Sequence, residues 1–215
     1  MSLVHVERPA AGDPEGLLVL HHGRGADEQD LLGLADVLDP HRRLHVASPR
    51  APLTLEDWPG HHWYLVPQVG YPDPETFHAA RAVLGAFHEE VWDRTGLTPE
   101  QTVLGGFSMG SVMSYTMAFD SDRPAVAGVL VFSGFVPTVD GWAPDFASRS
   151  ATRAFVSHGR RDRVIHIQFA RRALELMTAA GIEVDYHESD AAHHIDPAVT
   201  EPATGWLSGT VVARG

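Results

Sequence analysis

The stretch QTVLGGFSMGSVMSYTMAF, residues 101–119, guides the interpretation of the rest of the chain. An apolar run ends in Gly105 and Gly106, and one serine, Ser108, stands before Gly110 and an amphipathic run. Glycine costs conformational entropy in a packed element, so glycines on both sides of a serine indicate that the backbone needs room there. A Gly-x-Ser-x-Gly pattern between strand and helix is typical of a strained turn that exposes a serine hydroxyl. We therefore predict that Ser108 is a nucleophile.

Short β-rich apolar runs alternate with helical patterns on both sides of this stretch. The runs predict strands at residues 17–22, 43–48, 102–107, 126–133, 153–158 and 182–188, the last of them near the sheet edge. The longer patterns predict helices at residues 74–96, 109–119, 166–181 and 197–213. Such alternation is typical of βαβ units and predicts an α/β fold, a mostly parallel twisted sheet with helices on both faces. No linker or repeat divides residues 1–215, so we expect a single domain.

The composition narrows the classes of function. The net charge of −12 argues against nucleic acid and anionic membrane as partners, because phosphate groups need clustered cations. The absence of cysteine excludes disulfides, thiolate metal sites and a cysteine nucleophile. The N-terminal residues lack the pattern of a secretory signal, and no apolar run is long enough to span a bilayer. We expect a cytoplasmic protein without membrane insertion.

Residues 48–74 are rich in proline and aromatic residues and are predicted to form a long loop. Loops of this length are usually functional or disordered, and the aromatic residues favour an ordered one. We expect residues 53–74 of this loop to form one acyl-binding wall of the substrate pocket. The residues expected in that wall are Trp58, Trp63, Tyr64, Leu65 and Val66.

A serine nucleophile needs an imidazole to accept its proton and a carboxylate to orient that imidazole. In a parallel sheet, catalytic groups gather beyond the carboxyl ends of the strands. Asp162 follows the strand predicted at 153–158, and His193 and His194 follow the strand at 182–188. The chain order Ser, Asp, His is that of an α/β-hydrolase. The residues alone leave open which of the two histidines takes part.

Residues of these types can also have other roles. Asp162 could be a solvated turn residue among its neighbouring arginines, and Asp190 and Asp196 flank the histidines but would have to fold back onto them. The chain has 14 histidines, several in adjacent pairs. Adjacent histidines do not easily bind one ion together, and no zinc-binding spacing such as His-Glu-x-x-His occurs. We expect neither a metal nor another cofactor.

Six blocks carry a resemblance that covers nearly the whole chain. They are LHHGRGADEQDLLGLA (20–35), SPRAP (48–52), GGFSMGSVMS (105–114), SGFVP (133–137), HGRRDRVIH (158–166) and AAHHIDPAVTEPATGWL (191–207). With these blocks the chain resembles the phospholipase/carboxylesterase family of small α/β-hydrolases, which includes bacterial carboxylesterases and acyl-protein thioesterases. The resemblance implies a serine hydrolase of the α/β-hydrolase fold.

The family pattern also selects one histidine. Its catalytic histidine is followed by a tryptophan thirteen positions downstream, and His193 stands thirteen positions before Trp206. The resemblance therefore implies that the triad is Ser108, Asp162 and His193. It further implies an oxyanion hole formed by the main-chain N–H groups of Arg24 and Met109.

Three positions depart from the family pattern: Arg24, where leucine is usual, Met109, where glutamine is usual, and Ala192, where glycine is usual. The two oxyanion donors are main-chain groups, so the chemistry survives these changes. The Arg24 side chain has two candidate roles. It meets an anionic group of the substrate, or it pairs with Asp27 or Glu28.

We expect a carboxylesterase that cleaves short- to medium-chain esters through an acyl-enzyme. The segment between Ser133 and Asp162 is too short for a large cap domain, because a strand occupies part of it. The alternatives are a thioesterase or lysophospholipase with the same triad, and a non-catalytic binding protein on a hydrolase scaffold. The expected partner is a small ester, and a homodimer is left open.

Overall fold

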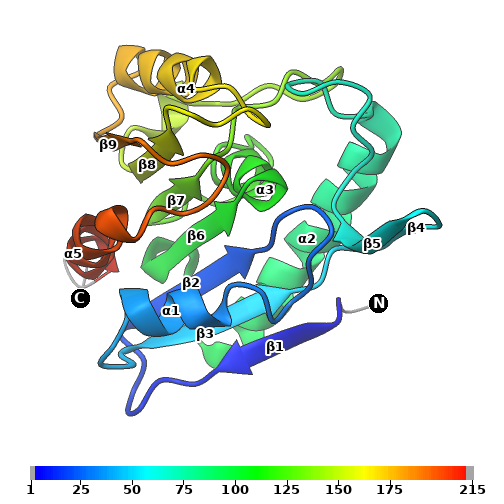
Figure 1. Cartoon of the computed structure of the whole chain (residues 1–215). Helices are drawn as coiled ribbons and strands as arrows, with labels where there is room; N and C mark the ends of the chain where they lie inside the picture. The colour runs from blue at the N-terminus through cyan, green and yellow to red at the C-terminus, as the bar shows by residue number, and fades with distance from the viewer. Residues whose placement is uncertain (1–2, 212–215) are drawn as a thin grey trace.

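The structure is a computed structural model that describes residues 3–211, and its centre is a seven-stranded sheet (Figure 1). The strand order is β1-β3-β2-β6-β7-β8-β9. The strands are β1 (His5–Arg8), β2 (Gly16–His21), β3 (Leu44–Pro49), β6 (Thr102–Phe107), β7 (Gly128–Phe132), β8 (Arg153–Gly159) and β9 (Val184–Ser189). All neighbouring pairs are parallel except β1 and β3. The predicted mostly parallel sheet is confirmed, and β9 lies at its edge.

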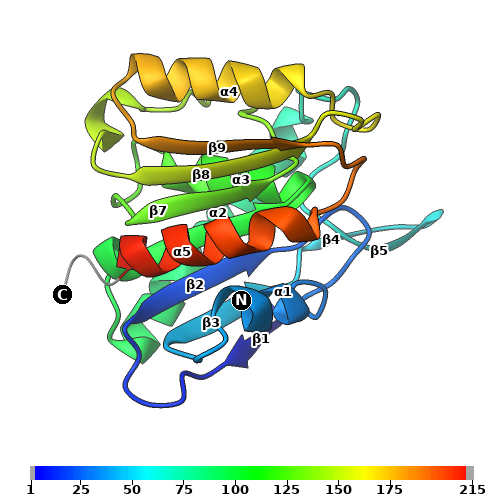
Figure 2. The same ribbon diagram turned by 60° about the vertical axis from the view of Figure 1, so that its left-hand side comes forward.

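Helices cover both faces of the sheet, as predicted (Figure 2). One face carries α2 (Pro74–Thr95), α3 (Met109–Ala118) and α4 (Gln168–Ala179), and the other carries α1 (Leu32–Leu38) and α5 (Thr200–Val211). The longest helix, α2, is well delimited by its sequence. The Asp73 side chain accepts a hydrogen bond from the Thr76 N–H at its start, and Gly96 ends it at φ 71°.

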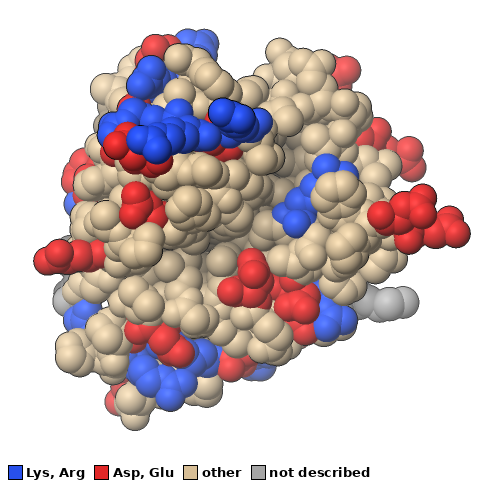
Figure 3. Space-filling view, viewed as in Figure 1, with Lys and Arg blue, Asp and Glu red and all other residues tan. Residues whose placement is uncertain are grey.

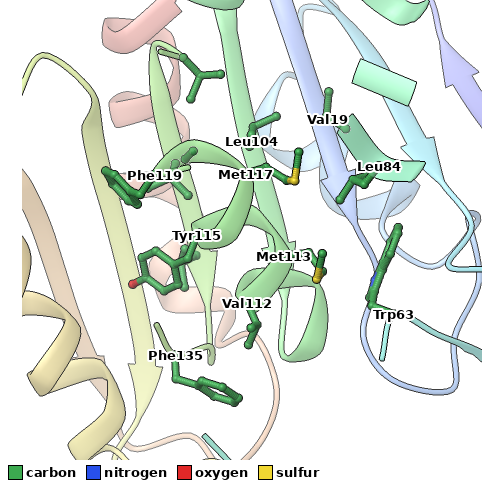
Figure 4. Close-up of a cluster of buried hydrophobic side chains, with 14 of the residues drawn as sticks. Val19, Trp63, Leu84, Leu104, Val112, Met113, Tyr115, Met117, Phe119 and Phe135 are labelled. Carbon is green, nitrogen blue, oxygen red and sulfur yellow. The ribbon is translucent and has the colours of Figure 1, made fainter. Parts of the chain in front are cut away.

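The strands are buried on both faces, and successive residues enter different cores. Leu17 and Val19 of β2 pack with the cluster under α2, α3 and α4, whereas Leu18 and Leu20 pack with the cluster under α1 and α5. Successive side chains of a strand point to opposite faces, so a continuous apolar run is what a doubly covered strand requires. Figure 4 shows the first cluster around α3, with Met113 among the labelled side chains.

Two of the elements have weak sequence signals, and both were missed by the prediction. β1 has the sequence HVER, in which Val6 is the one apolar residue, and only Arg8 is buried. α1 is seven residues long, contains Gly33, and has no side-chain hydrogen bond at its N-cap. Tertiary packing, rather than local propensity, holds such short elements.

The predicted loop at residues 48–74 is partly wrong. It contains the antiparallel hairpin of β4 (Leu53–Leu55) and β5 (Trp58–His62), whose register is irregular. Pro59 and Gly60 lie inside β5 and are typical of turns, which conceals the strand in the sequence. The helix predicted at 197–213 begins as a short 3-10 turn, η3 (Pro197–Val199), and residues 212–213 lie outside the described part.

The carboxyl ends of the parallel strands share one edge of the sheet, which brings the ends of β2, β6, β8 and β9 together (Figure 1). Residues 133–152, between β7 and β8, contain only the short 3-10 turn η2 (Ala147–Arg149), so no cap domain stands there. Within residues 3–211, no helix combines the length and the apolar character needed to cross a bilayer.

Candidate functional site

Ser108 stands at a sharp turn between β6 and α3 with φ 54° and ψ −118°, a strained backbone conformation for a residue with a side chain. The two flanking glycines permit the turn. A Cβ at Gly106 would lie 2.6 Å from the Gly110 carbonyl carbon, and a Cβ at Gly110 would lie 1.9 Å from the His21 carbonyl oxygen. The backbone could not close in this way around larger residues, so both glycines are required by close approach.

Ser108, His193 and Asp162 are joined in one hydrogen-bonded chain. The Ser108 Oγ lies 2.9 Å from His193 Nε2, and His193 Nδ1 lies 2.7 Å from Asp162 Oδ2. His194 is exposed. The ring of Phe107, the residue before the serine, lies 5.0 Å from the His193 ring. The structure thus brings together the three side chains that the sequence selected from separate strand ends.

Asp162 fixes the tautomer of His193. Its Oδ1 accepts hydrogen bonds from the main-chain N–H groups of Val164 and Ile165, each at 2.8 Å. Its Oδ2 is then free to accept the proton of His193 Nδ1, which leaves a lone pair on Nε2 facing the Ser108 hydroxyl. A neutral imidazole in this tautomer can accept the serine proton.

A second histidine, His158, lies next to the Asp162 carboxylate. His158, buried at the end of β8, donates from Nε2 to the Ile165 carbonyl oxygen at 2.7 Å, and the same nitrogen lies 3.4 Å from Asp162 Oδ2. Burial lowers the pKa of His158, which favours the neutral form of the ring. Sequence reasoning gave His158 no role, although its place at the carboxyl end of a strand is the same signal that located Asp162.

The two acidic alternatives to Asp162 are engaged elsewhere. Asp190 pairs with Arg160 at 2.9 Å, and the Asp196 side chain caps the Ala198 N–H at 2.9 Å. Within residues 3–211, no three side chains of the kinds that bind metals gather as ligands of one ion would.

Arg24 and Met109, the two residues expected to supply oxyanion donors, lie beside Ser108 in the pocket. Met109 opens α3, where the first amides have no partner within the helix and the helix dipole favours negative charge. Arg24 lies in the turn that follows β2, and Arg24, Met109 and Ser108 all line the same pocket. Among the hydrogen bonds within residues 3–211, none is donated by either of these two N–H groups. Both amides can therefore donate to an oxyanion.

The pocket beside Ser108 contains about 400 Å³ of empty space, part of it open to solvent, and its lining is mainly apolar. Figure 3 shows a hollow near the middle of this face, bordered mostly by uncharged atoms. The lining residues are Arg24, Tyr64, Val66, Val69, Ser108, Met109, Phe135, Val164 and Ile165.

Only two of the five residues expected in the pocket wall line this pocket. Tyr64 and Val66 line the pocket, but Trp63 is fully buried in the core and donates from its indole to the His22 carbonyl oxygen at 3.0 Å. Leu65 is exposed, and Trp58 lies on the hairpin in contact with Arg24. The chain bends after β5, and its side chains diverge: Trp63 enters the core, Leu65 faces solvent, and Tyr64 and Val66 face the pocket.

Four pocket residues were missed by sequence reasoning. Phe135 follows β7, Val164 and Ile165 follow β8, and Val69 lies beyond the hairpin. Three of the four lie directly beyond strand ends, so the rule that found Asp162 could have found them as well.

Two buried histidines lie behind the serine turn. His21 Nδ1 is 2.8 Å from Ser114 Oγ, which itself donates to the Gly110 carbonyl oxygen at 3.0 Å. The Ser114 oxygen therefore accepts a hydrogen bond from His21 Nδ1–H, and His21 Nε2 accepts one from His88 Nε2–H at 3.3 Å. This arrangement requires a neutral His21, because a protonated ring would carry a hydrogen on Nε2 as well and could not accept from His88. Burial lowers the pKa of His21 to about 3, and burial lowers the pKa of His88 well below its ordinary value.

We expect this histidine pair to make the fold acid-sensitive. Unfolding restores an ordinary pKa to each ring. Below about pH 6.5 the unfolded chain therefore binds more protons than the folded protein, and the free energy of unfolding decreases as the pH is lowered. The free energy of unfolding should decrease by up to about 1.4 kcal/mol per pH unit for each histidine. Urea unfolding at about pH 7, 6 and 5 measures this decrease.

Variants separate the buried pair from the other histidines. The variant His88→Leu should lose less stability than the parent over the same pH interval, whereas His41→Gln, at an exposed turn, should follow the parent. A free energy of unfolding that stays constant or rises from pH 7 to pH 5 would contradict the assigned neutral pair.

Comparisons with known proteins agree with this geometry. Residues 4–209 match the family model described as Phospholipase/Carboxylesterase. Lysophospholipase-like protein 1 of Mus musculus is 24% identical over 172 residues, which cover 76% of this chain and 71% of that protein. Acyl-protein thioesterase 1 of Debaryomyces hansenii is 26% identical over 157 residues, which cover 68% of this chain and 66% of that protein.

A solved structure extends the similarity to the whole fold. The crystal structure of esterase PE8 is 26% identical, with a TM-score of 0.81, and the match covers 98% of this chain and 100% of that one. The predicted α/β-hydrolase fold and the family resemblance are both confirmed by these matches. The chain therefore belongs to the phospholipase/carboxylesterase family.

Proposed function

We propose that this protein is a serine carboxylesterase that cleaves short- to medium-chain carboxylic esters through an acyl-enzyme on Ser108. The observation that supports it most is the chain of hydrogen bonds from Ser108 through His193 to Asp162, at 2.9 and 2.7 Å, beside an apolar pocket. Family membership makes a hydrolase the appropriate class of enzyme.

In the proposed reaction, Ser108 Oγ attacks the ester carbonyl carbon while His193 Nε2 accepts the hydroxyl proton. The N–H groups of Arg24 and Met109 donate to the oxyanion of the tetrahedral intermediate. His193 then gives its proton to the departing alcohol, and the acyl group remains on the serine oxygen. Water attacks this acyl-enzyme with His193 as the base, releasing the acid and restoring the serine hydroxyl.

The proposed chain length follows from the pocket. Tyr64 and Phe135 are nearly completely buried, and together with Val66 and Val69 they limit the space beside the serine. An acyl chain longer than this space has to leave the apolar wall and contact water. The proposal therefore favours acyl groups that end within the pocket.

A series of p-nitrophenyl esters from acetate to palmitate tests this proposal. We expect kcat/KM to reach its maximum between butyrate and octanoate and to fall at least about ten-fold at palmitate, since each unaccommodated methylene loses contact energy. A maximum at palmitate would contradict the proposed substrate class.

The second candidate activity is thioester hydrolysis with the same residues. It is favoured by the similarity to an acyl-protein thioesterase, and the similarity to a lysophospholipase-like protein likewise suggests lysophospholipid hydrolysis. Butyryl and octanoyl thioesters, each measured beside the oxygen ester of the same acyl group, separate the candidates. A higher kcat/KM for the thioester at equal chain length would favour the thioesterase.

A further inference from the structure

Arg24 contributes a positive side chain to an otherwise apolar pocket. It is exposed, and within residues 3–211 no carboxylate lies within ion-pair distance of its guanidinium. The acidic residues nearest in sequence have other partners. Glu28 forms a two-pronged ion pair with Arg50 at 2.5 Å, and Asp27 accepts from the Gln29 N–H at 2.9 Å. The sequence left two roles open for Arg24, an ion pair with Asp27 or Glu28 and contact with an anionic group of the substrate. The ion pair is not formed in the structure.

An unpaired arginine is unusual in this protein. The sequence contains no lysine, and most of the described arginines are paired with carboxylates. Those described without such a partner are Arg24, Arg42, Arg149 and Arg163. Arg149 donates to the carbonyl oxygens of Asp120 and Arg123 instead. Arg42 precedes β3, at the end of the sheet away from the site. Arg24 lines the pocket, and Arg163 stands between Asp162 and Val164 in the chain.

The Arg24 side chain is held in place by the hairpin. Its Cζ lies 4.3 Å from the centre of the Trp58 ring, so the flat guanidinium rests on the indole face. The hairpin is tied to the Arg24 loop by main-chain hydrogen bonds from Gly25 to His61 and from His61 to Ala26, each 2.9 Å long. A Cβ at Gly25 would lie 2.8 Å from the Trp58 Nε1, so the glycine permits this contact.

A stacked guanidinium keeps its N–H donors at its edge, where a carboxylate or phosphate can accept two parallel hydrogen bonds. The charge also reaches the pocket wall. Burial raises the pKa of Tyr64, and the Arg24 charge opposes that rise. The positive group is therefore fixed in position by Trp58 and belongs to a residue that lines the pocket.

We propose that the Arg24 side chain binds a carboxylate or phosphate group carried by the substrate, so that the preferred substrates are esters with an anionic group near the scissile bond. This inference rests on the proposed esterase function and specifies its substrate class. Trp58, expected from the sequence to be part of the pocket wall, instead acts as the positioning residue for Arg24.

Two pairs of esters test the inference and locate the anionic group. In the acyl arm, p-nitrophenyl hydrogen glutarate is compared with p-nitrophenyl methyl glutarate. In the alcohol arm, monobutyrylglycerol phosphate is compared with monobutyrylglycerol. The members of a pair differ in charge, so the ratio of their kcat/KM values within one variant cancels any loss common to both. We expect the parent to prefer the anionic ester by about ten-fold or more in one arm.

The variants assign the preference to one side chain. Arg24→Gln should bring the ratio to about one or below, since the protein carries a net charge of −12, and Arg24→Lys should retain part of the preference. Trp58→Leu should also reduce the ratio, because the guanidinium loses its support. Arg42→Gln is the matched control, since it removes an equal charge far from the site, and it should keep the parent ratio.

Several results would overturn the inference. They are a parent ratio of one or less in both arms, an unchanged ratio in Arg24→Gln, or loss of the preference in Arg163→Gln instead. A parent that hydrolyses the neutral esters without preferring the anionic ones contradicts only the role of Arg24. A parent inactive on all four esters contradicts the proposed function as well.

Discussion

Replacing Ser108 with alanine is expected to lower kcat for p-nitrophenyl acetate by about 10⁶-fold. The substitution removes the oxygen that forms the acyl bond and leaves His193 Nε2 without its partner at 2.9 Å. The fold should be kept, because the Ser108 side chain has no other hydrogen bond within residues 3–211. Initial rates of p-nitrophenolate release measure the effect, and circular dichroism checks the fold.

A second serine serves as the control for this experiment. Ser148 is exposed in η2 and its side chain bonds only locally, to Asp145. Ser148→Ala should hydrolyse the ester at about the parental rate. A folded Ser108→Ala variant within ten-fold of the parent would show that another group forms the acyl bond.

Replacing Asp162 with asparagine is expected to lower kcat by about 10⁴-fold. Three donors converge on the carboxylate: the N–H groups of Val164 and Ile165 on Oδ1, and His193 Nδ1–H on Oδ2. An asparagine has one oxygen to offer. If that oxygen accepts from the two main-chain N–H groups, the amide NH₂ faces His193 and forces the proton onto Nε2, where it points at the serine. If the amide is flipped, its NH₂ meets the two N–H groups instead.

Initial rates of p-nitrophenolate release measure the effect, and a nearby aspartate serves as the control. Asp190→Asn removes one of the acidic alternatives, whose carboxylate pairs with Arg160, and it should change kcat by less than about three-fold. Equal losses in Asp190→Asn and Asp162→Asn, or an Asp162→Asn variant that keeps most of the parental kcat, would exclude the proposed orienting role.

The main part of the fold is predictable because the strands of the sheet are covered on both sides. A strand such as β6 has no exposed face, so its residues read as one apolar run, and its predicted bounds at 102–107 agree with the structure. β1 and the β4–β5 hairpin lie at margins, where one face meets water and the apolar pattern is diluted. Their positions depend on the neighbours that they pair with, which a local pattern does not contain.

The residues of the candidate site were predictable to different degrees. The glycines around Ser108 are imposed by backbone contacts, so the sequence carries their signal directly. His193 and His194 are chemically alike, and local physics does not separate them. The distance to Trp206 does, because that tryptophan packs against Phe155 in the second core cluster and anchors α5, which fixes how the preceding loop reaches Ser108.

The pocket wall was the least predictable part. Its residues come from several loops, and the side that each side chain faces depends on loop conformation rather than on residue type. Trp63 shows this well: a large aromatic residue in a loop near the site is fully buried in the core. The role of Arg24 was not predictable from the sequence either. Glu28 pairs with Arg50, and Arg24 stacks on Trp58, and both contacts depend on the three-dimensional structure.

Mass spectrometry of the protein treated with a fluorophosphonate tests the central claim most directly, because such probes react with a serine activated by a neighbouring imidazole. The account predicts a single adduct on the peptide that contains Ser108, no adduct in Ser108→Ala, and none in the urea-unfolded parent. Esterase activity should decline in step with labelling. An adduct on a different residue, or a parent that hydrolyses esters while Ser108 stays unlabelled, would contradict it.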